Sequence, residues 1–216
     1  MALRSREEFL DRNLAVVPVT TTALALPAYN SDLSAYARAV FLTDSSGNPV
    51  DPAIGTFANP SANFTRPADT TAYASGDLVA NSTTAGSVSP MQFTVARVAG
   101  GSFMLRRVKI TKSTTSVTNA SFRLHLFLAS PATITNGDNG AFSVSGVAAG
   151  ALGRFDVTID QAYTDGAAGW GVPVTGFDMS IDLSSGLIIY GLLEARAAYT
   201  PGSAEVFTVT LDDLQN

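Results

Sequence analysis

The sequence predicts an all-β protein, an antiparallel β-sandwich of jelly-roll-like type that follows an extended N-terminal arm. The first observation is strict alternation, clearest where Phe122, Leu124 and Leu126 alternate with polar residues, because successive strand residues point to opposite faces. The second is that turn residues separate such runs at the intervals typical of a sandwich. The third is that no sustained 3.6-residue pattern follows residue 14. An immunoglobulin-like sandwich is the nearest competing fold.

The N-terminal region differs in composition from the rest of the chain. Residues 3–14 could form a short helix, since Ser5 and Glu8 have capping-box spacing, or only a frayed amphipathic turn. Residues 15–35 are rich in Val, Pro, Thr, Ala and Leu and lack the polarity of a flexible linker, so we expect an arm that lies on something apolar. We therefore expect an anchoring segment over 1–62 and a sandwich domain over 63–216.

The expected strands follow in chain order. Within the arm segment, Tyr36–Leu42 could form a first strand, and the next twenty residues are irregular and rich in turn residues. Eight further runs form the predicted sandwich: Asp77–Ala80, Met91–Val98, Phe103–Lys112, Ser121–Ala129, Phe155–Ile159, Phe177–Leu183, Gly186–Ala195 and Val206–Leu211. The short Ser184-Ser185-Gly186 break predicts a hairpin between the two runs beside it. We expect the two strands between Phe103 and Ala129 at the centre of the sandwich.

Composition narrows the classes of function. The 216 residues are 46% hydrophobic and only 14% charged, against roughly 25% charged in an average domain. Low charge is also typical of surfaces that partners cover. The net charge of -5 and the scattered basic residues indicate no nucleic-acid binding, and no apolar stretch is long enough to span a bilayer. The chain has no cysteine, which excludes disulfides and thiolate chemistry.

The residue types that could support catalysis or metal binding form no convincing site. His125, the single histidine, lies mid-strand without a nucleophile motif nearby. Two carboxylate pairs at i, i+4, namely Asp178 with Asp182 and Asp156 with Asp160, could suggest a glycosidase, but an acidic surface produces such pairs by chance. A loop with Asn136, Asp138 and Asn139 could hold calcium, although turn chemistry explains these residues equally. We predict no enzyme, no cofactor and no metal.

Two aromatic residues offer a candidate binding site. Tyr163 and Trp170 flank a Gly- and Ala-rich stretch that we interpret as a loop. Exposed rings there could stack on a sugar or a protein partner, whereas rings beneath the loop would belong to the core. The expected interface residues are these two and five apolar residues of the arm: Val16, Val17, Val19, Leu24 and Leu26.

A family resemblance adds a function to this picture. Residues 64–81 read FTRPADTTAYASGDLVAN, and residues 106–113, 119–128 and 137–142 read RRVKITKS, NASFRLHLFL and GDNGAF. Together these stretches resemble structural proteins of tailed bacteriophages that are often encoded among head genes. The resemblance extends over about residues 63–215.

The resemblance implies a non-enzymatic virion protein. We expect a capsid decoration (cement) protein, made in the host bacterial cytoplasm, that binds the outer head surface and stabilises contacts between capsomers. Its expected partners are the major capsid protein and further copies of itself in a homotrimer, without nucleic acid or membrane. The alternatives are a tail or adsorption-apparatus protein that binds a host glycan, and a glycan hydrolase using Asp178 and Asp182.

Overall fold

The computed structural model describes residues 29–30, 35–36, 56–176 and 178–215. The chain divides into two compact units, Met1–Pro52 and Ala53–Asn216. In the first unit, β1 (Tyr29–Asn30) pairs antiparallel with β2 (Ala35–Tyr36). The helix predicted for residues 3–14, the five apolar arm residues and nearly all of the strand predicted over 36–42 lie outside the described residues.

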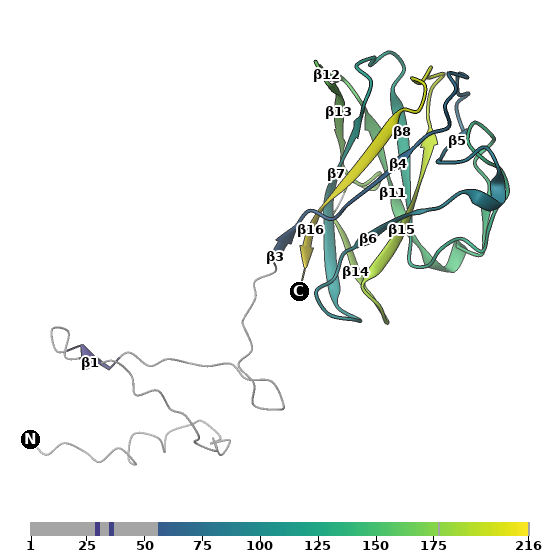
Figure 1. Ribbon diagram of the computed structural model, residues 1–216. Coiled ribbons are helices and arrows are strands. Elements are labelled where there is room, and N and C mark those ends of the chain that lie inside the picture. The colour runs from purple at the N-terminus through teal and green to yellow at the C-terminus, as the bar shows by residue number, and fades with distance from the viewer. Residues whose placement is uncertain (1–28, 31–34, 37–55, 177, 216) are drawn as a thin grey trace, which may run out of the picture. The chain divides into compact units, whose positions relative to one another are not determined.

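The second unit is a sandwich of two antiparallel sheets (Figure 1). In the first sheet, β8 lies between β11 and β15, and β5 and β6 share the far edge of β15. Its strands are β5 (Leu78–Val79), β6 (Met91–Thr94), β8 (Ser121–Phe127), β11 (Ala151–Thr158) and β15 (Ile188–Ala195). The predicted all-β sandwich is therefore correct.

The second sheet is built around the two longest strands of the domain. β7 and β16 pair along nearly their whole length, β13 and β14 share the other edge of β7, and β3 and β4 share the far edge of β16. Its strands are β3 (Thr56–Ala58), β4 (Ser61–Thr65), β7 (Ser102–Lys112), β12 (Gln161–Tyr163), β13 (Gly166–Gly171), β14 (Met179–Asp182) and β16 (Val206–Gln215).

The pairings of the main strands are nested. Eight main strand positions follow in chain order: β4, β6, β7, β8, β11, β13 together with β14, β15 and β16. The first pairs with the last (β4 with β16), and the second pairs with the seventh (β6 with β15). The third, β7, pairs with β13 and β14, and the fourth, β8, pairs with the fifth, β11. The chain therefore resembles one long antiparallel hairpin that has been rolled up.

The tertiary structure corrects two expectations. All eight predicted sandwich runs contain a strand, and the two between Phe103 and Ala129, β7 and β8, are inner strands of different sheets. The Ser184–Gly186 break joins β14 to β15 across the two sheets and is not a hairpin, because each strand finds its partners in its own sheet. The expected boundary at residue 62 falls inside β4, which pairs with β16, so the compact unit begins at Ala53.

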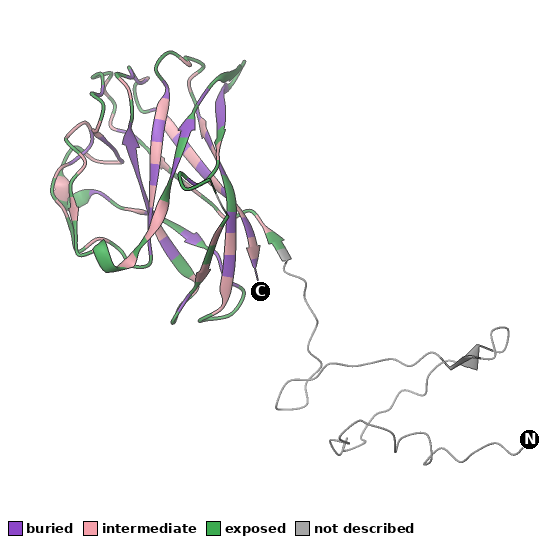
Figure 2. Cartoon of the chain, turned by 180° about the vertical axis from the view of Figure 1, so that it is seen from behind, coloured by how far each residue is buried: buried purple, intermediate pink, exposed green. Residues whose placement is uncertain are grey.

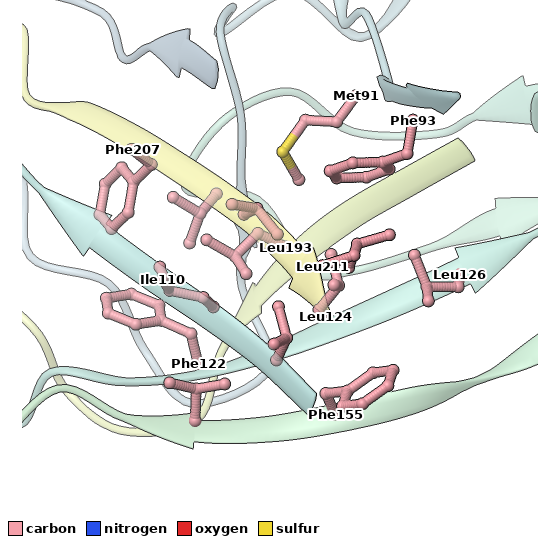
Figure 3. Packing of buried hydrophobic residues seen from close by; sticks show 14 of the residues in the cluster. Met91, Phe93, Ile110, Phe122, Leu124, Leu126, Phe155, Leu193, Phe207 and Leu211 are labelled. Carbon is pink, nitrogen blue, oxygen red and sulfur yellow. The ribbon is translucent and has the colours of Figure 1, made fainter. Parts of the chain in front are cut away.

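The core lies between the two sheets (Figure 3). Phe122 packs edge-on against Phe207 at 5.2 Å between ring centroids, which joins β8 of one sheet to β16 of the other. Along β7 and β16, buried residues alternate mainly with partly exposed ones (Figure 2), so the period-2 pattern of the sequence corresponds to inner and outer faces.

The outer face of the first sheet carries a second, smaller hydrophobic cluster. Phe127 and Leu192 on the sheet pack beneath Phe142 and Val144 of the segment 128–150. That segment contains β9 (Thr133–Ile134), β10 (Val144–Ser145) and the short 3-10 turn η2 (Ala148–Gly150), and a second such turn, η1 (Ala85–Ser87), precedes β6. Among the described residues, no helix is long and apolar enough to cross a membrane.

Candidate functional site

A buried ionic cluster lies where the distinctive 64–81 stretch meets the 137–142 turn. The Arg66 guanidinium donates to Asp138 at 2.8 Å, and both side chains are fully buried. The Tyr73 hydroxyl accepts a hydrogen bond from Arg66 and donates to Asp138 at 2.6 Å. The backbone N–H of Ala80 also donates to Asp138, at 2.8 Å. These bonds fasten two distant loops to each other.

A second buried pair lies beside the first. Lys112 at the end of β7 donates to Glu205 at 3.2 Å, and the Tyr199 hydroxyl donates to the same carboxylate at 2.7 Å. The rings of Tyr73 and Tyr199 stack at 6.4 Å between centroids and connect the two pairs. Together they form one polar cluster at the end of the sandwich where β4 and β7 finish and β16 begins.

The electrostatics of this cluster favour a structural role. Burial lowers the pKa of Arg66, but Tyr73 and Asp138 outweigh it and leave the pKa above its usual value. Burial, reinforced by Asp138, raises the pKa of Tyr73 well above that of a free tyrosine. Since Arg66 stays charged and Tyr73 stays neutral, these groups are fixed hydrogen-bond partners rather than proton carriers.

His125 lies on the outer face of β8, half buried beside the 128–150 segment. Its Nε2 lies 2.7 Å from Glu194 Oε2, and the Phe142 ring stacks on the imidazole at 4.3 Å between centroids. Burial lowers the pKa of His125, and its hydrogen bond to Glu194 only partly offsets this, so the neutral imidazole is favoured at pH 7. The histidine thus packs between the sheet and its covering segment, as its scaffold position in the sequence suggests.

One carboxylate of each of the two predicted pairs contacts an arginine. Asp156 accepts two hydrogen bonds from Arg123, at 2.5 and 2.7 Å, which lower its pKa despite the opposing effect of partial burial. Asp178 lies 3.5 Å from Arg106 in an exposed ion pair. Because Arg123 lowers the pKa of Asp156, this carboxyl group is poorly suited to be the general acid that glycoside hydrolysis requires.

The loop considered for calcium is occupied by protein contacts. Both carboxylate oxygens of Asp138 are bonded within the buried cluster, and Asn136 donates to the carbonyl of Ala141 at 2.8 Å. Asn139 has a positive φ of 63°, which turn-forming asparagine tolerates. In the described part of the chain, no group of three or more His, Asp or Glu side chains could hold a metal ion.

A shallow groove on the outer face of the second sheet is the candidate binding site, with a volume of about 490 Å³. Both sequence-predicted aromatics line it: Tyr163 is 50% exposed on β12, and Trp170 is 46% exposed on β13. Lys109 and Thr111 reach it from β7, where Lys109 is the cross-strand partner of Trp170. The remaining lining residues are Lys112, Ser113, Asp165, Gly166, Ala167, Ala168, Val206 and Thr208.

The Gly- and Ala-rich stretch at this groove is a strand, which corrects our interpretation of it as a loop. A Cβ added to Gly169 would lie 2.2 Å from the carbonyl oxygen of Thr158, and one added to Gly171 would lie 2.4 Å from that of Asp156. Small residues are needed here because β13 passes directly against the backbone of β11. The two aromatics are therefore exposed on a rigid hairpin and do not belong to the core.

The opposite end of the same outer face is apolar. Phe57, 69% exposed on β3, is the cross-strand partner of Leu214, and Leu214 in turn faces Met104 on β7. Phe57 follows the boundary of the compact unit by a few residues. The sequence offers little indication of this apolar row, because its three residues are 47 to 157 positions apart and come together only through strand pairing.

No protein-family model matches this chain, and no curated protein matches it either.

Proposed function

We propose that this protein is a non-enzymatic capsid decoration protein of a tailed bacteriophage, located on the virion exterior. The observation that carries the proposal is the resemblance of residues 63–215 to phage structural proteins. The buried ion pairs Arg66–Asp138 and Lys112–Glu205 support it, because they are fixed contacts that hold loops in place. Such groups add rigidity and leave binding to the outer surfaces.

We further infer that the sandwich is a jelly roll. The support is the nested strand pairing, in which the first strand pairs with the last and the second with the seventh. Jelly rolls recur in viral capsid and lectin domains. A fold of this kind presents broad, rigid sheet faces, which suit a protein that works through contact area.

The apolar row Phe57, Leu214 and Met104 is the proposed contact with the major capsid protein. Aromatic and Met side chains are enriched at interfaces. Along the chain, Phe57 follows the N-terminal unit by a few residues, and in that unit we expect Val16, Val17, Val19, Leu24 and Leu26 to anchor the protein. Three copies around a local three-fold axis would bury such surfaces jointly, and analytical ultracentrifugation should then give the mass of a trimer.

Binding to heads tests this function. Full-length protein should co-sediment with expanded heads of the parent phage that lack it, and cryo-electron microscopy should place its density on the outer lattice. Phe57→Ser combined with Met104→Ser should weaken binding about tenfold or more. Val174→Ser, a matched change at an exposed valine outside the row, should not. Density at the tail and none on the head would refute the proposal.

A further inference from the structure

We propose that the groove beneath Trp170 and Tyr163 binds a saccharide chain. This inference stands on the groove alone and does not depend on where the protein sits in a particle. It differs from the decoration role, which needs only the apolar end of the same sheet.

The two rings lie on the same face of the second sheet, one on each strand of the β12–β13 hairpin. Trp170 is the partner of Lys109, which points outward, and Tyr163 pairs with Gly166 next to the turn. Each ring is about half exposed although both are large and apolar. A sugar presents a flat C–H face that packs on such rings, while its hydroxyls point sideways toward polar groups.

The floor between and beside the rings is polar. Thr111 on β7 and Thr208 on β16 are cross-strand partners, and their outward position offers hydroxyls that both donate and accept. Lys109 and Asp165 line the same hollow, and neither has an ion-pair partner among the described residues. One free donor and one free acceptor next to aromatic rings match the hydroxyl groups of a sugar. The interior of a protein–protein interface is instead depleted of Lys and Asp.

The groove is also held rigid from below. Lys112 and Val206 line it, and Lys112 is fixed by its buried pair with Glu205 and by Thr114. A preformed hollow of about 490 Å³ lies within the usual size range of ligand sites. Preorganisation limits the entropy lost on binding, which matters for flexible oligosaccharides.

Trp170 can serve as a fluorescent probe of this site, because it is the single tryptophan of the chain. Tryptophan emission from the full-length protein, excited selectively over its six tyrosines, therefore reports on the groove. The probes are malto-, cello-, xylo- and chitohexaose and oligosaccharides released from surface polysaccharides of the host bacterium. We expect at least one of them to change Trp170 emission in a saturable way and to bind on a glycan array.

Variants separate this site from general surface effects. Tyr163→Ala should weaken saccharide binding about tenfold, and Lys109→Ala should also weaken it. On the array, Trp170→Ala should abolish binding, while Trp170→Phe, which keeps a ring, should restore part of it. Val172→Ala, which removes an exposed apolar side chain two residues away, should bind like the unaltered protein. Circular dichroism should show all variants folded.

Two results would overturn the inference. One is an array and a fluorescence titration that stay silent for every saccharide. The other is a Trp170 emission change caused by phage heads and not by any saccharide, since the groove would then be a protein interface. Neither result would argue against the proposed decoration function, which the Phe57 and Met104 variants test separately.

Discussion

At the scale of single residues, the distinctive stretch that begins at Arg66 has a physical explanation. Arg66 and Asp138 are 72 positions apart and form a fully buried ion pair to which Tyr73 adds two hydrogen bonds. Burying charges costs free energy, which such a pair recovers only when its remaining hydrogen-bonding groups are satisfied. The stretch is therefore a device that fixes loop geometry.

Breaking this pair should be costly. Asp138→Asn leaves the buried Arg66 charge with only its longer contact to the partly exposed Asp69, at 3.4 Å, so the free energy of unfolding should fall by about 3–5 kcal/mol in urea titrations. Arg107→Ala, which breaks the exposed pair with Asp212, should cost less than about 1 kcal/mol. An Asp138→Asn protein as stable as the Arg107→Ala protein would contradict a structural role for the pair.

A second residue predicts a pH effect. Asp213 is buried, and its Oδ1 has no hydrogen-bond partner among the described residues. Burial raises the pKa of Asp213 from 3.8 to about 6, although Gln215 opposes this. Between about pH 4 and 6 the folded protein keeps a proton that the unfolded chain has already lost. Stability should therefore fall as pH rises through this window, by about 3 kcal/mol at most, and stay reduced above it.

Asp213→Asn removes this ionisation. The variant should be more stable than the unaltered protein at pH 7.5 by about 1–3 kcal/mol and equally stable near pH 4. Thermal unfolding followed across pH 4–8 measures the difference. Asp182→Asn, at an exposed carboxylate of β14, is the matched control and should leave the pH profile unchanged. A parallel shift at all pH values would show that Asp213 ionisation is not the cause.

At the scale of elements, β13 is a strand whose Gly- and Ala-rich sequence is more typical of a loop. Gly169 and Gly171 both face β11, whose carbonyl oxygens lie where side chains would begin. The glycines thus permit close approach of two strands from different sheets. The aromatic Trp170 between them faces the opposite way, into the groove.

A methyl group at this contact should disturb the packing. Gly169→Ala should lower the free energy of unfolding by about 1–3 kcal/mol, because either β13 or β11 must move. Gly86→Ala is the control, since nothing lies within 4 Å of a Cβ there, and it should change stability by less than about 0.5 kcal/mol. Equal stability of the two variants in chemical denaturation would rule out the close contact.

At the scale of the whole molecule, the compact unit Ala53–Asn216 contains a complete sandwich with its own core. The strands at both ends of this unit, β3 with β4 and β16, pair with each other and close the second sheet. Its stability therefore rests on contacts made within the unit.

A protein reduced to residues 53–216 should fold alone. Its melting temperature should lie within a few degrees of that of the full-length chain in differential scanning calorimetry, since the same core is buried. Under the proposed function it should bind heads more weakly, because it lacks Val16, Val17, Val19, Leu24 and Leu26. A truncated domain that unfolds at a much lower temperature would show that residues 1–52 belong to the folding unit. A truncated domain that still saturates heads would remove the anchoring role of the arm.

The sequence by itself determined the all-β class and located eight of the sandwich strands, because alternation of apolar residues reports directly on burial of one strand face. It also singled out Tyr163 and Trp170. It did not identify β4 or β13 as strands. Only the tertiary structure decided that β7 and β8 lie in different sheets, since strand partners depend on contacts between distant segments. Pairing likewise brought Lys109, Thr111 and Thr208 beside the two aromatics. No local sequence pattern specifies the register between strands, and this register determines which side chains line the groove.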